Sequence, residues 1–227
     1  MKYFATADNR EAKARKIEAV LCDHLGVERV QGRRILDLGC GSGHIAEYFS
    51  RGNSVVAADV VDQLRVPRGA ALEFKKMNGA ALPFEDGSFD IVIYNHVLFC
   101  LPDQLGQMRE IKRVLKNTGA CYLATANRYF PREGFTKVFL IHYLPQRVFR
   151  AVYKAIRRKD LELHPVGYHG IRALITRSGF TAREYTAEIV HHPERYHSDH
   201  AIPSFLPVPV CMSPTVVFVL SKQEYAP

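Results

Sequence analysis

The segment Asp37-Leu38-Gly39-Cys40-Gly41-Ser42-Gly43 constrains the fold of this chain more than any other feature. It follows an apolar run at 34–38 that predicts a strand, and a segment with helical spacing of its apolar residues begins directly after it. Three glycines within five residues let the backbone turn tightly and approach a ligand closely. In an open α/β sheet, ligands bind at the carboxyl ends of the strands. The sequence therefore predicts a ligand site at the end of this first strand.

Apolar runs and amphipathic segments alternate through the first half of the chain. The expected strands lie at 34–38, 54–58, 71–75, 89–94 and 120–124, and the expected helices lie at 9–26, directly after 43 and at 105–115. Strands that alternate with helices pair in parallel through right-handed crossovers. We therefore expect an α/β fold with a doubly wound sheet.

The alternation breaks after residue 126. Residues 127–165 are aromatic and basic, and they predict an inserted lid that is helical at 144–158. The alternation then resumes with an expected helix at 170–178 and expected strands at 181–189 and 214–220. This organisation predicts a single domain over 1–227, with an N-terminal helix within 1–28 and a helical lid at 127–165.

The composition excludes several classes of protein. Hydrophobic residues make up 47% of the 227 residues, which is enough for one sizeable core and excludes a disordered chain. No apolar run approaches the roughly 20 residues that cross a bilayer, and the first residues lack the apolar stretch of a signal peptide. We therefore expect a cytoplasmic protein. The five cysteines include no C-x-x-C pair, so we expect neither a disulfide framework nor a structural zinc site.

The net charge of +8 is concentrated in one segment. Residues 137–177 contain nine basic and two acidic residues, so the rest of the chain is close to neutral. Apolar and basic residues recur at helical spacing over 147–159, which predicts a basic amphipathic helix. Three interpretations remain open: an ordinary lid helix packed on the domain, a lid at a membrane surface or over a lipid-linked substrate, and a surface for a phosphorylated or nucleic-acid substrate.

The spacing of the glycines argues against a dinucleotide. The dinucleotide fingerprint G-x-G-x-x-G needs a third glycine at position 44, where this chain has His44. The loop also lacks the lysine with which a P-loop holds phosphates. The loop therefore predicts a different ligand.

The run at 35–43 resembles the first motif of the class I S-adenosylmethionine-dependent methyltransferases. The resemblance covers about residues 30–125 and continues in chain order through Asp59, Met77–Phe84, Asp86–Asp90 and Glu110–Lys116. It is nearest to the ubiquinone/menaquinone-biosynthesis-type group of small-molecule methyltransferases. It implies a Rossmann-like sheet of seven mostly parallel strands with an antiparallel last strand. It also implies S-adenosyl-L-methionine as cofactor and S-adenosyl-L-homocysteine as product.

The resemblance carries cofactor-binding roles to particular residues. Asp59 matches the acidic residue that holds the ribose hydroxyls, and a carboxylate can accept two such hydrogen bonds. Asn78 stands where an aspartate usually meets the adenine amino group, and its amide oxygen can still accept that bond. The expected cofactor-binding residues are Asp37, Gly39, Cys40, Gly41, Gly43, Asp59, Asn78, Gly79 and Asn95.

Residues that follow the fourth and fifth expected strands predict the acceptor pocket. His96 lies just past the end of the fourth strand and is the candidate general base; the alternative is a histidine that packs under the cofactor. In the related S-H-V-L-E-H run, the glutamate and second histidine correspond here to Phe99 and Cys100. The expected pocket and lid residues are Tyr94, Asn127, Phe139, His142 and Tyr143. We expect no metal, because the late histidines at 191, 192, 197 and 200 match no zinc spacing.

Together these features predict methyl transfer from S-adenosylmethionine to a small-molecule or lipid-linked acceptor, at oxygen. The lid at 135–159 is a candidate for peripheral contact with a membrane. One alternative is an RNA methyltransferase that uses the basic segment 137–177, although we expect no separate RNA-binding module beside the domain. Another alternative is a methyltransferase-like binding protein that has lost catalysis. The intact loop and Asp59 argue against the second alternative.

Overall fold

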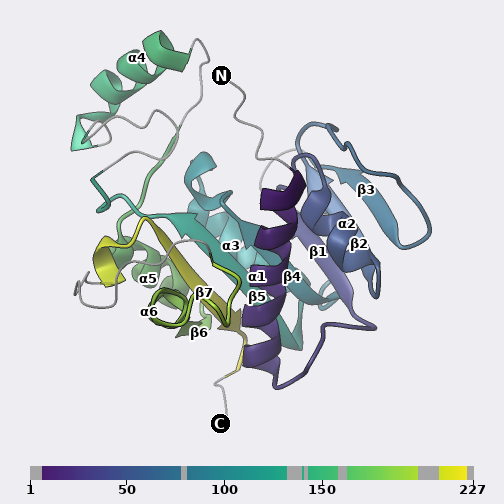
Figure 1. Cartoon of the computed structure of the whole chain (residues 1–227). Helices are drawn as coiled ribbons and strands as arrows, with labels where there is room; N and C mark the ends of the chain where they lie inside the picture. Colours follow the sequence, from purple (N-terminus) through teal and green to yellow (C-terminus); the bar gives the residue numbers. More distant parts are fainter. Residues whose placement is uncertain are drawn as a thin grey trace.

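A seven-stranded sheet runs through the centre of the protein (Figure 1). The computed structural model describes residues 7–77, 81–131, 140, 143–157, 163–198 and 210–223. Within these residues the strands are β1 (Arg34–Leu38), β2 (Ser54–Asp59), β3 (Leu72–Lys76), β4 (Phe89–Asn95), β5 (Leu115–Ala126), β6 (Thr181–Glu184) and β7 (Thr215–Ser221). The helices are α1 (Ala7–Leu25), α2 (His44–Ser50), α3 (Gln104–Val114), α4 (Gln146–Arg157), α5 (Tyr168–Arg177) and α6 (Thr186–His191), with short 3-10 turns η1 (Leu98–Cys100) and η3 (Val210–Met212).

The strand order is β3-β2-β1-β4-β5-β7-β6. The first five strands in this order, from β3 to β5, pair in parallel, and β7 runs antiparallel to both of its neighbours. This confirms the predicted doubly wound, mostly parallel sheet with an antiparallel last strand. The chain leaves β1 toward β2 on one side and returns to β4 on the other. The carboxyl ends of β1 and β4 therefore flank the point where a sheet of this kind binds its ligand.

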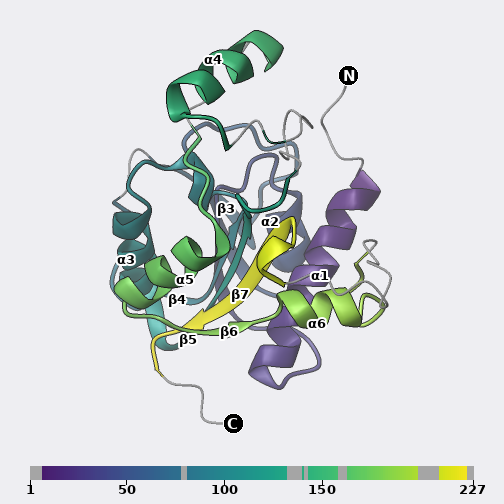
Figure 2. The ribbon, with the colours of Figure 1, turned by 90° about the vertical axis from the view of Figure 1, so that its left-hand side faces the viewer.

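Helices cover both faces of the sheet, as Figure 2 shows. On one face, α1, α2 and α6 enclose a core that includes Leu21, Phe49 and Tyr185. On the other face, α3 and α5 enclose a second core that includes Met108 and Ile171. The inner strands β1, β2, β4, β5 and β7 are buried on both sides, which explains why they read as continuous apolar runs.

Helix α3 shows how local sequence sets an element. The Asp103 carboxylate accepts a hydrogen bond from the Gly106 amide at the helix start, 2.8 Å away, which is a typical N-cap interaction. Met108, Ile111 and Val114 follow at helical spacing and are fully buried. The helix thus begins at a cap and presents one apolar face to the sheet.

The prediction of one strand over 181–189 was wrong. The strand ends at Glu184, and α6 follows at once. The reason lies at Thr186, whose hydroxyl accepts a hydrogen bond from the Val217 amide, 3.0 Å away. A side chain therefore takes the place of the next bond between β6 and β7. The chain turns there, and Ile189 is buried from a helix instead of a strand.

Helix α4 stands at one end of the molecule, clear of the rest of the domain in both views (Figures 1 and 2). It lies within the segment 127–165, for which we predicted a helical lid. Its attachment is described below.

Candidate active site

The glycine-rich loop lies at the carboxyl end of β1, as the sequence predicts. Gly39, Gly41 and Gly43 all adopt positive φ, at 76°, 54° and 81°, a backbone region that side chains disfavour. A Cβ on Gly39 would lie 2.2 Å from a methyl of Val97, and one on Gly43 would lie 2.3 Å from a methyl of Leu64. Glycine is therefore required at both ends of the loop.

The middle of the loop faces open space. A Cβ built on Gly41 would meet no atom within 4 Å, so a ligand can approach the backbone there. The Gly41 amide donates a hydrogen bond to Oδ2 of Asp59, at 2.8 Å. The other oxygen, Oδ1, accepts from the Val60 amide at 2.7 Å. Asp59 at the end of β2 thus sets the position of the loop that follows β1.

Asp37 contributes a buried carboxyl group beneath the loop. Its side chain is 2% exposed, and its Oδ2 has no hydrogen-bond partner among the described residues. The pKa of Asp37 is raised to about 7: burial raises it most, a hydrogen bond from the Ala46 amide lowers it, and the nearby Asp59 carboxylate raises it. Two acidic groups therefore lie at the loop, where they favour a ligand that carries positive charge.

Cys40 contributes no reactive thiolate to the loop. The side chain is half-buried, and burial together with the charges of Asp37 and Asp59 raises the pKa of its thiol far above the ordinary value. Its backbone amide donates to the Ala58 carbonyl, at 3.2 Å. Cys40 therefore contributes its backbone to the shape of the loop.

The carboxyl end of β4 brings His96 to the same edge of the sheet. His96 has φ 59°, which is strained for a residue other than glycine and occurs often at functional sites. Its amide donates to the Ala124 carbonyl at the end of β5, 2.7 Å away. The next residue, Val97, is the one that packs on Gly39. The backbone of β4 thus places Asn95 and His96 beside the glycine loop.

The surroundings of His96 lower the pKa of its imidazole to about 4, although the residue is exposed to solvent. Desolvation by the surrounding protein is the largest cause, and the positive charges of Lys13 and Lys16 on α1 contribute to the lowering. The imidazole is therefore neutral at pH 7 and has a free lone pair with which to accept a proton.

Two of the predicted pocket residues have other roles in the structure. Tyr94, the next-to-last residue of β4, is 0% exposed, because it packs in the core on the face of the sheet that α3 covers. Asn127 is 5% exposed, and its amide group bonds to four backbone groups, so nothing remains for an acceptor. Those bonds go to the carbonyls of Cys211 and Ser213 and the amides of Tyr129 and Tyr168. Asn127 joins the end of β5 to the starts of β7 and α5.

The remaining predicted residues divide into two groups. Tyr143 is 45% exposed, and its hydroxyl donates to the Tyr129 carbonyl at 2.8 Å. Asn78, Gly79, Phe139 and His142 lie outside the described residues.

A small apolar cluster that sequence reasoning missed attaches α4 beside His96. Phe149 of α4 is 2% exposed and packs with Phe99 of η1 and Leu163. The Phe99 ring also meets the His96 ring edge-on, with centroids 6.4 Å apart. The sequence contains one indication of this cluster: Phe99 and Cys100 stand where the related family run has a glutamate and a histidine. Apolar residues at the edge of a site need an apolar partner, which α4 provides.

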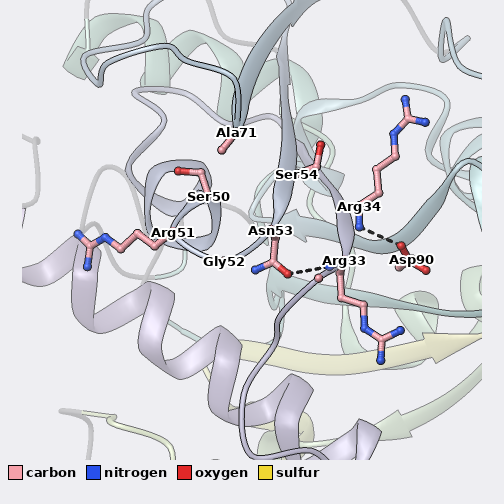
Figure 3. A pocket seen from close by; sticks show the side chains of 10 residues that line it. Arg33, Arg34, Ser50, Arg51, Gly52, Asn53, Ser54, Ala71 and Asp90 are labelled. Atoms are coloured by element: carbon pink, nitrogen blue, oxygen red, sulfur yellow. Dashed lines mark hydrogen bonds between the residues drawn. The ribbon is translucent and has the colours of Figure 1, made fainter.

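A cavity of about 570 Å³ opens at the opposite edge of the sheet (Figure 3). It lies at the amino ends of β1, β2 and β4 and is lined in part by Arg33, Arg34 and Arg51, whose side chains point away from one another. Asn53 also lines the cavity, and its Oδ1 accepts a hydrogen bond from the Arg33 amide at 3.0 Å. None of the predicted site residues lines this cavity.

Comparisons with known proteins identify the family to which a chain with this fold and glycine loop belongs. A family described as "Methyltransferase domain" matches residues 36–123, the span from β1 to β5. The demethylmenaquinone methyltransferase of Lactococcus lactis is 30% identical over 173 residues, which cover 68% of each chain. This chain belongs to the S-adenosylmethionine-dependent methyltransferases.

Two further matches agree with this membership. The methyltransferase is 30% identical over 142 residues to the ubiquinone biosynthesis O-methyltransferase of Pseudomonas aeruginosa, covering 57% of this chain and 61% of the relative. The chain thus spans about three fifths of that relative's length. An S-adenosylmethionine dependent methyltransferase from Mesorhizobium loti has the same fold, with a TM-score of 0.60, 17% identity and coverage of 95% and 98% of the two chains.

The described part of the methyltransferase contains no helix that is long and apolar enough to cross a membrane. In the same residues, no group of three His, Cys, Asp or Glu side chains is placed to hold a metal ion.

Proposed function

We propose that this methyltransferase transfers a methyl group from S-adenosylmethionine to a hydroxyl group of a small-molecule acceptor. The observation that carries the proposal is the hydrogen bond between Asp59 and the Gly41 amide. It joins the acidic residue at the end of β2 to an open glycine loop at the end of β1. Family membership and the Pseudomonas O-methyltransferase relative support the same function.

The residues at the loop fit the chemistry of this cofactor. Asp59 can hold the ribose hydroxyls, since each carboxylate oxygen accepts more than one hydrogen bond. The open face of Gly41 admits the ligand to the backbone. The acidic groups of Asp37 and Asp59 suit a ligand with a positive sulfonium and a positive amino group. Gly39, Cys40 and Gly43 shape the loop, and Asn95 lies beside it at the end of β4. We also assign Asn78 and Gly79 to the cofactor from the family pattern.

When bound, S-adenosylmethionine supplies an electrophilic methyl group on sulfur. The protein's main contribution is then to align the acceptor with that methyl group and to exclude water. Neutral His96 accepts the proton from the acceptor hydroxyl as the oxygen attacks. The cluster of Phe99, Phe149 and Leu163 shields this edge of the site from solvent. These roles make His96 the proposed base and α4 the proposed lid.

Transfer of a labelled methyl group tests this function. The protein is incubated with methyl-labelled S-adenosylmethionine and a cell extract, which is then separated into lipid, aqueous small-molecule, protein and RNA fractions. We expect label in the lipid or small-molecule fraction, in a product that resists base as an ether does. Label in RNA would instead establish the RNA methyltransferase, and saturable cofactor binding without any label would establish the inactive binding protein.

A further inference from the structure

The apolar residues of α4 and of the turn before it are only partly covered. Phe149 is 2% exposed, and Val152 packs partly on the same cluster. The cluster rests on η1, which is itself fixed: Gln104 donates from its side chain to the carbonyls of Leu98 and His164, at 3.1 and 2.8 Å. The base of α4 is thus held firmly at the edge of the site that contains His96.

The apolar residues at the start of α4 and just before it are exposed to solvent. Val148 is 46% exposed on α4, and the turn that precedes the helix exposes Leu140, Tyr143 and Leu144 at 56%, 45% and 40%. These four side chains make up half of the large hydrophobic residues that are exposed in the described part of the chain. Soluble surfaces rarely gather apolar side chains in this way without a binding partner. We call these four residues the outer patch.

The charge around the outer patch indicates which partner fits. Residues 135–159 contain seven basic residues and no acidic residue. Of these, Arg147 and Lys154 are exposed on α4. A second copy of this chain would bring the same positive charge to the contact, which disfavours self-association. Apolar residues with a basic flank on a helix too short to span a bilayer are the composition of an interfacial helix.

We propose that the outer patch docks on the surface of an anionic lipid bilayer. The apolar side chains enter the boundary between headgroups and acyl chains, and exposed basic residues of α4 such as Arg147 and Lys154 attract the negative headgroups. Because Phe149 and Phe99 join α4 to His96, docking places the site at the membrane, where an apolar acceptor can enter along the lid. The statement about the acceptor rests on the proposed function; the docking itself does not.

Vesicle co-sedimentation of the full chain tests the docking. The vesicles are either pure phosphatidylcholine or contain roughly 30% phosphatidylglycerol, whose anionic headgroups give the vesicle a negative surface. The test variant is Leu144→Glu/Val148→Glu, which places two charges in the outer patch. The matched control is Gln31→Glu/Ala71→Glu, which adds the same charge at exposed positions on the opposite edge of the sheet. All three proteins are also titrated with S-adenosylmethionine, which shows that each is folded.

We expect the wild type and the control to sediment with anionic vesicles at low salt and not with neutral ones. The test variant should lose this binding by about tenfold or more while it keeps its affinity for the cofactor. Equal binding of the test variant and the control would overturn the proposal, as would no binding of the wild type. A dimer in light scattering that only the test variant loses would also overturn it, in favour of a second copy. Failure to bind S-adenosylmethionine would contradict the proposed function and leave the vesicle result to decide the docking.

Discussion

His96 shows how a single residue can meet opposing requirements at a site. A general base must hold a lone pair at the working pH, and it is most effective when its pKa lies near that pH. Desolvation by the surrounding protein and the two lysines of α1 satisfy the first requirement and weaken the second, since the pKa of His96 falls to about 4. The imidazole therefore acts through its position beside the acceptor more than through its basicity.

Replacement of His96 by alanine tests its role as a base. We expect the His96→Ala variant to lower kcat by about 100-fold, the smaller end of the contribution of a general base, with no change in affinity for S-adenosylmethionine. The wild-type kcat should show no inflection from His96 between pH 6 and 8, because its pKa lies well below that range. His191→Ala, an exposed histidine on α6, is the matched control. Equal kcat for His96→Ala and the wild type would remove His96 from catalysis and leave it a packing role.

Asp37 is the residue whose ionisation should affect folding most directly. Its pKa is about 7 in the folded protein, against an ordinary value of 3.8. Between these values the folded state binds more protons than the unfolded state, so the free energy of unfolding falls as pH rises from about 4 to 7. The free energy of unfolding falls by roughly 4 kcal/mol at most. The whole of this decrease has occurred once the pH exceeds the folded-state pKa.

The Asp37→Asn variant tests this linkage. We expect its stability in urea to vary much less between pH 4 and 7 than that of the wild type, because the ionising group is gone. Asp62→Asn is the control, since Asp62 is exposed and paired with Arg68. An unchanged pH dependence in Asp37→Asn would show that Asp37 is ionised throughout this range.

At the scale of elements, the sequence predicted the strands of the sheet better than the segments that follow it. Five strands from 34 to 126 could be located because buried parallel strands are continuous apolar runs between turn residues. The end of β6 could not, since it depends on the bond between the Thr186 hydroxyl and the Val217 amide, 31 residues away. The role of Asn127 depends in the same way on Cys211 and Ser213. Contacts between residues far apart in the chain leave no local pattern.

The attachment of α4 gives a prediction at this scale. Phe149→Ala removes the ring that packs on Phe99 and Leu163, a change that costs about 3 kcal/mol in a well-packed core. Because this cluster is the anchor of α4, the cost falls on the lid. We expect limited trypsin digestion to cleave residues 147–159 at least several-fold faster in this variant, with the rest of the domain still resistant. Val148→Ala on the exposed face is the control. Equal cleavage rates in both variants would show that α4 is held by other contacts.

At the scale of the whole molecule, the residues of the proposed site lie together at one edge of the sheet. The carboxyl edge gathers the glycine loop, Asp59 and His96, because parallel strands deliver all of their following loops to one side. Family motifs predicted this gathering, since they mark where each strand ends. The same motifs do not specify the acceptor, because the lid that covers it lies beyond the residues that match the family, 36–123.

The most direct measurement of the central claim is a calorimetric titration of S-adenosylmethionine into the wild type and the Asp59→Ala variant. Asp59 holds the Gly41 amide and is the proposed partner of the ribose hydroxyls, so its loss removes hydrogen bonds to a charged group, worth about 1.5–3 kcal/mol each. We predict one binding site in the wild type and at least a tenfold weaker affinity in Asp59→Ala, with Asp62→Asn unchanged. Equal affinity in the wild type and Asp59→Ala would contradict the placement of the cofactor at this loop.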